Sequence, residues 1–385
     1  MASGKGTTET TPASSPTPRS GAFEYVFPAI RGTQAGHEYY VTMCPLRIIP
    51  RLFLFNEEEL PPEMRAQRSL NKGRVPEMAR YVVENPDSYI FSALTASVNA
   101  EVRFESLAGG SGAAERVGTL TIPMSATFVI NDGQHRRAAI QQALAENPAL
   151  GDETIAIVMF IDVGLQRCQQ MFADLNRYAV RPPPSIGVLY DHRDPMAELT
   201  RQVVNSNAFL RDATDMENSS LSRRSRKLFT LSAMHTANAS LLEGIHEDEF
   251  ESRVQLASKY WQAVATQFPQ WLQASSGEIT AGGLREDFIH THSIVLHALG
   301  RVGNALLRKS EDPQVWEQTL MKLKTIDWHR ANAAVWEGRA TSGGNVSKSR
   351  RNVELTTAYI RTTLGLPLPP DEQRAEEALA RGEKK

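Results

Sequence analysis

Six consecutive residues combine side chains that bind anions with a glycine that permits a tight turn. They are Asp132, Gly133, Gln134, His135, Arg136 and Arg137. An apolar run at residues 126–130 precedes them and a run of helix formers at 138–144 follows, so we expect a strand, a turn and a helix. Free N–H groups at the start of that helix, together with two adjacent guanidinium groups, suit the oxygens of a phosphate. The sequence predicts an anion site here, for a nucleotide or for nucleic acid.

The same residues also allow an interpretation without a ligand. Asp132, Arg136 and Arg137 could cap the helix and pair with nearby carboxylates. His135 could be a buried imidazole with an ordinary hydrogen bond, although an imidazole is also a usable proton donor near neutral pH. Residue types alone leave both interpretations open.

A second group of cations and hydroxyls occupies residues 219–227, directly before the apolar Leu228 and Phe229. The candidate DNA contacts in it are Ser222, Arg223, Arg224, Arg226 and Lys227. We expect a helix to start within this group, so that hydroxyls, cations and helix N–H groups meet the DNA phosphate backbone. The alternative is a solvated basic helix face without a partner.

A third basic segment, residues 339–351, is rich in glycine and serine and precedes a helical run at 352–363. Its candidate DNA contacts are Lys348, Arg350 and Arg351. Such a loop could become ordered on a DNA backbone, and a plain flexible linker fits its composition equally well. No helix-turn-helix pattern accompanies these segments, so they predict affinity for phosphates and no readout of base sequence.

Two other sequence patterns, a histidine cluster and a kinase-like triplet, are weak evidence for a functional site. His290, His292 and His297 do not share one face of a helix, because neither two nor five residues return to the same side. We therefore predict no metal site. The triplet at residues 192–194 matches the HRD of protein kinases, but no glycine-rich loop or DFG accompanies it.

The order of patterns predicts an α+β fold. Strands are expected at residues 39–43, 47–55, 88–94, 117–122, 126–130 and 154–161. Helices are expected from Val75 to Asn85, after Gly133, and from Gly164 to the prolines at 182–184. A loop is expected at residues 109–112, and amphipathic helices dominate beyond residue 195. The five tryptophans fall mostly in such helices, where core packing is the expected role.

These patterns divide the chain into four parts. Residues 1–20 are rich in Ser, Thr, Gly and Pro without an apolar stretch, which indicates a disordered tail and no signal peptide. An α/β domain at 21–195 and an all-helical domain at 196–366 follow. Residues 367–385 are expected to be a charged, frayed tail.

Composition narrows the class of protein. The net charge is −2 over 385 residues, so contact with nucleic acid must come from local patches. No apolar run approaches the ~20 residues that span a bilayer, and we expect no membrane contact. Cys44 and Cys168 are too few for a zinc or iron–sulfur site, and they indicate a reducing cytoplasm without a disulfide.

Residues 128–140, which contain the DGQHR motif, resemble the signature of the DndB family of regulators associated with DNA sulfur (phosphorothioate) modification. Further blocks fit that family in the same order, at residues 29–36, 65–71, 91–97, 169–177, 189–194 and 221–229. The match is dense over roughly residues 25–240 and looser beyond. Several blocks in one order are far more specific than any single pentapeptide.

The DGQHR family is in turn similar to the ParB/sulfiredoxin superfamily, which implies a ParB-like fold for the N-terminal domain. In that superfamily a glycine turn with basic residues and a later polar motif bind nucleotide phosphates. The later motif corresponds here to Asp174, Asn176 and Arg177. The nucleophilic cysteine of sulfiredoxin falls near Gln134, so redox chemistry is not implied. The acidic metal ligand of ParB falls on Ala173, which puts hydrolysis in doubt unless Asp174 replaces it.

The resemblance implies a cytoplasmic, nucleoid-associated transcriptional regulator that binds the double-stranded promoter DNA of a modification gene cluster. Other DNA sulfur modification proteins are further candidate partners, and a homodimer stays open. The alternative is a nucleotide-binding or nucleotide-hydrolysing enzyme. In it Asp132, His135, Arg136 and Asp174 would bind a nucleotide with Mg²⁺ and transfer protons. No cofactor and no catalytic residue is assigned with certainty.

Overall fold

The computed structural model describes residues 23–53, 72–108, 112–161, 164–177, 182–245, 249–310 and 312–382. Its contacts divide the chain into two compact units, Met1–Val180 and Arg181–Lys385. The tail expected at residues 1–20 and most of the loop expected at 109–112 lie outside the described residues. The fold is a mixed α/β fold, as expected, with its main sheet in the first unit and helices dominating the second.

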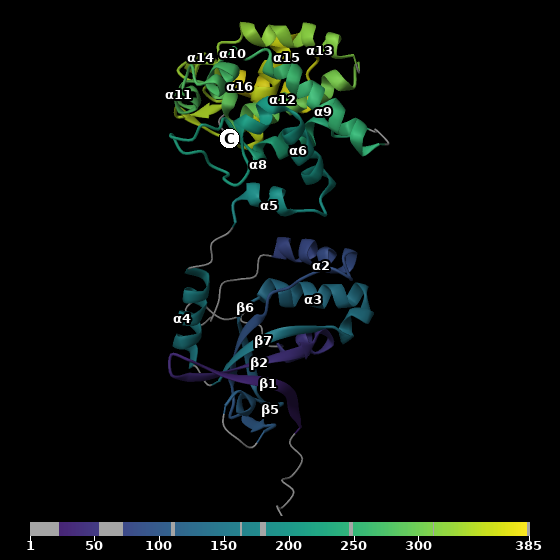
Figure 1. The fold of residues 1–385 in the computed structure, drawn as a ribbon, viewed down its shortest axis with the longest axis vertical. Coiled ribbons are helices and arrows are strands. Elements are labelled where there is room, and N and C mark those ends of the chain that lie inside the picture. The colour runs from purple at the N-terminus through teal and green to yellow at the C-terminus, as the bar shows by residue number, and fades with distance from the viewer. Residues whose placement is uncertain are drawn as a thin grey trace, which may run out of the picture. The chain divides into compact units, whose positions relative to one another are not determined.

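The first unit is built on a seven-stranded sheet in the order β4-β5-β1-β2-β7-β3-β6 (Figure 1). Neighbouring strands are antiparallel except for β3 and β7, which are parallel. The strands are β1 (Glu24–Gln34), β2 (His37–Pro45), β3 (Leu94–Asn99), β4 (Arg103–Ser106), β5 (Val117–Pro123), β6 (Thr127–Asp132) and β7 (Thr154–Ile161). The helices are α1 (Ile49–Leu52), α2 (Val75–Glu84), α3 (Gln134–Glu146) and α4 (Gly164–Arg177).

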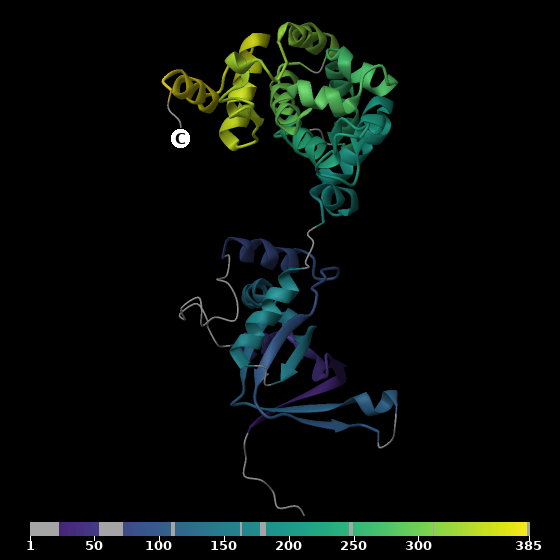
Figure 2. The same cartoon turned by 90° about the vertical axis from the view of Figure 1, so that its left-hand side faces the viewer.

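Alternation along the strands gives the sheet one buried face, because successive side chains point to opposite sides. Phe27, Tyr40, Leu120 and Ile157 lie on that face and pack with Ile140 of α3. Helix α2 packs in turn on α3, and both are visible beside the sheet (Figures 1 and 2). Helix α4 contacts β6 from the opposite face. The strand β6, which leads into the DGQHR turn, is therefore held from both sides.

Two predicted strands are wrong. Residues 46–52 are helical, because Pro50 lies at the start of α1 and cannot donate to a strand ladder. The strand predicted from residue 88 begins only at Leu94, as β3. The residues before it are held by aromatic side chains instead: Tyr81 Oη accepts from Ile90 N at 2.9 Å, and the rings of Tyr89 and Phe91 pack edge to face. A long strand at 24–34, β1, was not predicted.

The second unit is helical, with two short pairs of strands. Its helices are α5 (Pro184–Tyr190), α6 (Pro195–Ser206), α7 (Ala208–Ala213), α8 (Leu231–Leu241), α9 (Phe250–Ala265), α10 (Pro269–Ser276), α11 (Ala281–Asp287), α12 (Ser293–Leu307), α13 (Pro313–Leu320), α14 (Ala333–Trp336), α15 (Arg350–Leu364) and α16 (Pro370–Ala380). The strands are β8 (Thr214–Asp215), β9 (Phe229–Thr230), β10 (Thr341–Ser342) and β11 (Asn345–Val346).

The core of this unit surrounds α12, which packs against α8 and α15. All five tryptophans are buried in it, which confirms their expected role. Helix α5 also belongs here: Ser185 Oγ donates to Asn218 O at 2.9 Å and accepts from Ser232 N at 3.2 Å. The contacts thus divide the chain at residue 180, earlier than the boundary expected at 195, because the second unit includes α5.

The expectation of a frayed tail from residue 367 is wrong for most of that segment, which forms α16. The carboxylate of Glu372 is fully buried between Arg301 Nη2 at 3.0 Å and Arg361 Nε at 3.1 Å. Two cations around one buried carboxylate attach this helix to α12 and α15. Both cysteines are free thiols, as expected. None of the described helices has the length and apolarity to cross a membrane.

Candidate functional site

The DGQHR motif forms the strand, turn and helix that its sequence predicts. Strand β6 ends at Asp132, Gly133 makes the turn, and α3 begins at Gln134. Gly133 has φ +106° and ψ 18°, a left-handed conformation, and its carbonyl accepts from Arg137 N at 2.9 Å. Gly133 at the N-cap has no side chain to cap this helix start, no other described residue caps it, and its first turn contains no acidic residue. The positive end of the helix dipole is therefore not neutralised by its own first turn.

Glycine is required at this turn for two reasons. A left-handed φ costs an L-residue ~1–2 kcal/mol, and a Cβ at Gly133 would lie 2.4 Å from Leu94 Cδ2. We expect Gly133→Ala to lower the melting temperature by several degrees, from a loss of roughly 2 kcal/mol. Gly187→Ala in α5, where a Cβ has open space and φ is ordinary, is the control. An unchanged melting temperature for Gly133→Ala would contradict the assignment.

Both guanidinium groups of the motif have partners within the protein. Arg136 donates to Asp132 Oδ2 at 2.7 Å and to Ser92 Oγ, and its side chain is only 14% exposed. Arg137 donates to Gln141 Oε1 at 2.7 Å and to Phe53 O at 3.0 Å. Burial lowers the pKa of the Arg137 guanidinium. These contacts fix the start of α3 against α1 and β6, which is the role expected from the interpretation without a ligand.

The second part of the proposed ParB-like site lies on α4. Met171 of this helix is 3.9 Å, Sδ to Nδ2, from Asn131 of β6, so the two parts belong to one region of the first unit. Asp174 accepts from Gln170 Nε2 at 2.8 Å within the helix. Arg177 lies at the end of α4, and the side chain of Asn176 lies outside the described residues.

The basic residues at 219–227 form an irregular loop between β8 and β9, which we call the basic loop. The predicted helix start within it is wrong: α8 begins only at Leu231, because Thr230 Oγ1 accepts from Ala233 N and caps the helix there. Ser225 N donates to Ser222 O at 2.9 Å and closes a turn in the loop.

One arginine from a distant helix holds the basic loop in place. The guanidinium of Arg285 in α11 donates to the backbone carbonyls of Ser222 at 2.6 Å, Ser225 at 3.2 Å and Lys227. Gly282, one turn earlier, lets the loop approach closely, since a Cβ there would lie 2.0 Å from Arg223 O. The conformation of the loop is therefore set by α11 as well as by its own sequence.

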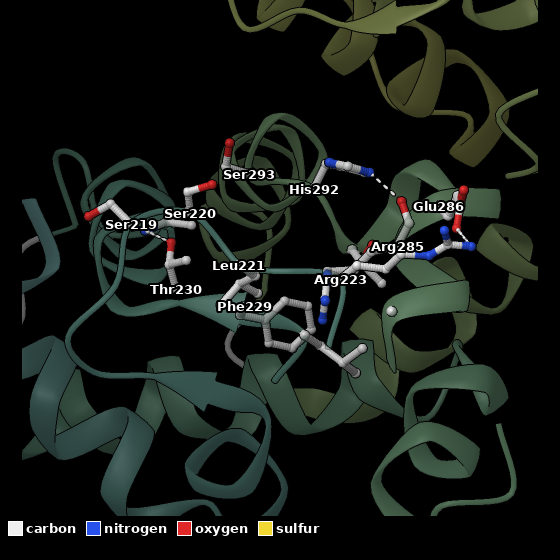
Figure 3. Close-up of a pocket in the computed structure, with 14 residues that line it drawn as sticks. Ser219, Ser220, Leu221, Arg223, Phe229, Thr230, Arg285, Glu286, His292 and Ser293 are labelled. Carbon is white, nitrogen blue, oxygen red and sulfur yellow. Dashed lines mark hydrogen bonds and ion pairs between the residues drawn. The ribbon is translucent and has the colours of Figure 1, made fainter. Parts of the chain in front are cut away.

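A cavity of about 440 Å³ lies between the basic loop, α11 and the start of α12 (Figure 3). Most of the lining is polar, and it contains Arg223, Glu286 and His292. Leu221 supplies apolar surface, whereas Phe229 is almost fully buried behind it. His292 Nε2 donates to the backbone carbonyl of Arg285 at 2.8 Å, and burial lowers the pKa of its imidazole. The side chain of His292 thus joins the start of α12 to α11. The N-cap residue of α12, His292, makes no capping hydrogen bond with its side chain, and this helix has fifteen residues.

The cations of the basic loop differ in whether they have a partner within the protein. Arg223 Nη2 pairs with Glu286 Oε2 at 2.8 Å, and both side chains are more than half exposed. Lys227 Nζ donates to Asp212 O at 2.8 Å and so caps the end of α7. Arg224 and Arg226 are exposed, and within the described part of the chain they have no hydrogen-bonded or ionic partner. Two cations of the loop are therefore available to an external anion.

The third predicted patch is ordered by its own contacts. Residues 341–346 form a β10–β11 hairpin. Glu337, which precedes the hairpin, holds its turn: Glu337 Oε1 accepts from Gly343 N at 2.6 Å. Arg350 starts α15, pairs with Glu354 at 2.9 Å and is 90% exposed, and Arg351 follows it in the same helix. Burial and the charge of Lys348 lower the pKa of His297 in α12 to about 4. Helix α12 thus runs from the cavity at its start to the third patch.

Sequence reasoning missed the residues that complete the cavity. Arg285, Glu286 and Ser293 belong to no motif, and His292 was considered only as a metal ligand. These residues contact the basic loop although they lie about sixty residues later in the chain, and no local sequence pattern predicts such a contact.

The fold and the site define a protein of two units, an α/β sheet domain and a helical domain that displays cations beside a polar cavity. A sequence model of the DndB family, described as DNA-sulfur modification-associated, matches residues 27–367. The chain belongs to this family. No curated protein and no solved structure gives a match. The ParB relation of the first unit stays a prediction.

Proposed function

We propose that this protein is a DNA-binding transcriptional regulator of a gene cluster for DNA phosphorothioate modification. Membership of a family associated with DNA sulfur modification supports the biological setting. The observation that carries DNA contact is the pair of exposed arginines, Arg224 and Arg226, on a loop whose backbone is fixed by Arg285. A fixed loop positions its cations before binding, so less conformational entropy is lost when they meet phosphates.

The mode of binding follows from the side chains that the basic loop displays. Arginines on a loop reach phosphate oxygens, which fix the register of a protein on DNA without reading base sequence. Arg350 at the start of α15 is a further exposed candidate, although it pairs with Glu354. Double-stranded promoter DNA is the proposed partner, with cytoplasmic, nucleoid-associated localisation.

The alternative, a nucleotide-hydrolysing enzyme at the DGQHR turn, has weaker support. Arg136 and Arg137 would have to leave Asp132 and the carbonyl of Phe53 before they could hold phosphates. Thermal-shift measurements with ATP, CTP and GTP, with and without Mg²⁺, test it. Stabilisation that is lost in His135→Ala/Arg136→Ala would favour the enzyme over the regulator.

A footprint of the purified protein on the DNA upstream of its own gene tests the proposal directly. We expect protection of a defined segment, with an affinity that falls as salt rises, because cations on the protein displace counterions from the phosphates. Absence of protection, with unchanged mobility of the DNA in gel-shift titrations at low salt, would refute it.

Glu286 provides a test in which binding should increase. Glu286→Gln removes a carboxylate from the edge of the cavity and releases Arg223 from its ion pair. We expect affinity for DNA to rise about threefold to tenfold and the salt dependence to steepen by roughly one unit. Glu251→Gln, an equal change of charge at an exposed position of α9, is the control. Equal gains in both variants would attribute the effect to net charge alone.

A further inference from the structure

The last helix, α16, turns its carboxylates toward the protein. Asp371, Glu372 and Glu376 are partly or fully buried, whereas Gln373 and Glu377 of the same helix are exposed. A surface helix ordinarily buries an apolar face and keeps its charges in water. Helix α16 lies at the edge of the second unit, as the yellow helix beside the C-terminus in Figure 2 shows, and its inward face is acidic.

Each of the three inward carboxylates pairs with an arginine of the helical unit, at N···O distances of 2.7 to 3.5 Å. Arg301 of α12 pairs with Asp371 and Glu372, Arg361 of α15 pairs with Glu372, and Arg339 pairs with Glu376. Arg339 donates to both oxygens of its partner, from Nε at 3.2 Å and from Nη2 at 2.7 Å. These arginines come from three separate parts of the chain, so α16 covers a surface that the folded unit assembles.

Charge more than apolar burial attaches α16 to this surface. Besides its acids, the inward face carries Ala375, Ala378 and Leu379, which are all partly exposed. Buried ion pairs add little net stability, because the cost of removing both charges from water offsets their attraction. Apolar side chains on this face would hold the helix at least as well. An attachment through carboxylates differs in one respect, since another anion can compete for the same cations.

The arginines under α16 continue the third basic segment. Arg339 is the first residue of that segment, and Arg350 at the start of α15 is 90% exposed. Glu354 and, more weakly, Asp371 raise the pKa of the Arg350 guanidinium, so α16 also acts on this exposed cation. When α16 is displaced, the cations of α12, α15 and residue 339 form one positive surface.

We propose that this surface is a second contact for the DNA backbone and that α16 covers it in the absence of DNA. Phosphates replace the carboxylates of α16, because a guanidinium binds both anions through the same pair of N–H groups. This inference rests on the proposed function: DNA held at the basic loop brings phosphates to the helical unit at high local concentration. Arg301 lies eight residues after Ser293, about 12 Å along α12, which is short beside the ~34 Å of one turn of DNA.

Hydrogen exchange of the full-length protein, free and saturated with a duplex of its own upstream DNA, tests the proposal. We expect the amides of α16 to exchange at least about fivefold faster in the complex, because the helix leaves its ion pairs. The amides of α12 should keep their rates. Exchange in α16 that is unchanged or slower in the complex would overturn the inference and leave the proposed function standing. Absence of any complex at low salt would overturn both.

Substitutions on α16 give a second, independent test. Asp371→Asn/Glu376→Gln removes two of the three inward charges and keeps the buried carboxylate of Glu372. We expect DNA affinity to rise about fivefold, because phosphates then displace a helix that only one carboxylate holds. Adding Arg339→Gln should remove most of this gain, since Arg339 is one of the cations that the phosphates reach.

A control pair separates the release of α16 from a change in overall charge. Glu251→Gln/Glu317→Gln makes the same change of charge at exposed positions of α9 and α13. It should raise DNA affinity by less than about twofold. Equal gains in the control pair and the α16 pair, or a gain that persists after Arg339→Gln, would attribute the effect to net charge, and the proposal would fall.

Discussion

Replacing Arg224 and Arg226 together with alanine is expected to weaken DNA binding at least about tenfold at low salt. Each side chain is exposed and without a partner in the described part of the chain, so little stability should be lost. Each lost phosphate contact should also reduce the slope of log affinity against log salt by about 0.9. Two lost contacts should therefore flatten it by nearly two units. Gel-shift or anisotropy titrations over a range of salt concentrations measure both quantities.

A matched control separates local contact from overall charge. Lys259→Ala/Lys309→Ala removes two exposed cations from α9 and from the residues after α12, at the same cost in net charge. We expect this pair to change neither the affinity nor the salt slope appreciably. If the control reduced both as strongly as the arginine pair, binding would depend on charge spread over the unit, and the basic loop would have no special role.

The second large effect on DNA affinity is expected from replacing Arg285, whose guanidinium binds the backbone of the basic loop. Arg285→Met keeps most of the apolar stem and removes the donors to the carbonyls of Ser222, Ser225 and Lys227. Two of these carbonyls accept in part-buried positions and one is exposed, so we expect a loss of roughly 1–3 kcal/mol in the free energy that orders the basic loop. DNA affinity should fall at least about tenfold because the arginines are no longer positioned.

Hydrogen exchange at the amides of residues 219–227, measured beside DNA affinity, tests this prediction. Faster exchange confined to the basic loop, together with weaker binding, is the expected result. Arg308→Met is the control, since Arg308 Nη2 also donates to a backbone carbonyl, that of Glu243 at 2.7 Å. It should leave DNA affinity unchanged. Unaltered exchange in Arg285→Met would refute the positioning role of Arg285.

Much of the first unit could be predicted because its signals are local. The alternation in β7, the proline at the start of α2 and the glycine before α3 each act within a few residues. The failures at residues 47–53 and 88–93 have the opposite cause, and residues 54 and 55 of the first predicted strand lie outside the described residues. Both segments are rich in residues that favour strands, but Pro50 and the packing around Tyr81 decide their conformation.

In the candidate site, too, some features could be predicted from local sequence and others depended on tertiary contacts. Its basic residues are visible in the sequence, because a cluster such as 222–227 is unusual in a chain of net charge −2. Which of them are free could not be predicted. Lys227 caps α7 and Arg223 pairs with Glu286, whereas Arg224 and Arg226 point to no internal partner in the described residues.

The sequence by itself determined that a glycine turn joins β6 to α3, because the φ of Gly133 and the helix-forming run after it depend on neighbouring residues alone. It also determined the family, through blocks spread along the chain. Only the tertiary structure decided what the charged groups do. Arg136 turns to Asp132, and Arg285 comes from α11 to hold a loop sixty residues earlier in the chain. The physical reason is that hydrogen bonds and ion pairs select partners by distance in space, which packing of the whole core sets and local spacing does not encode.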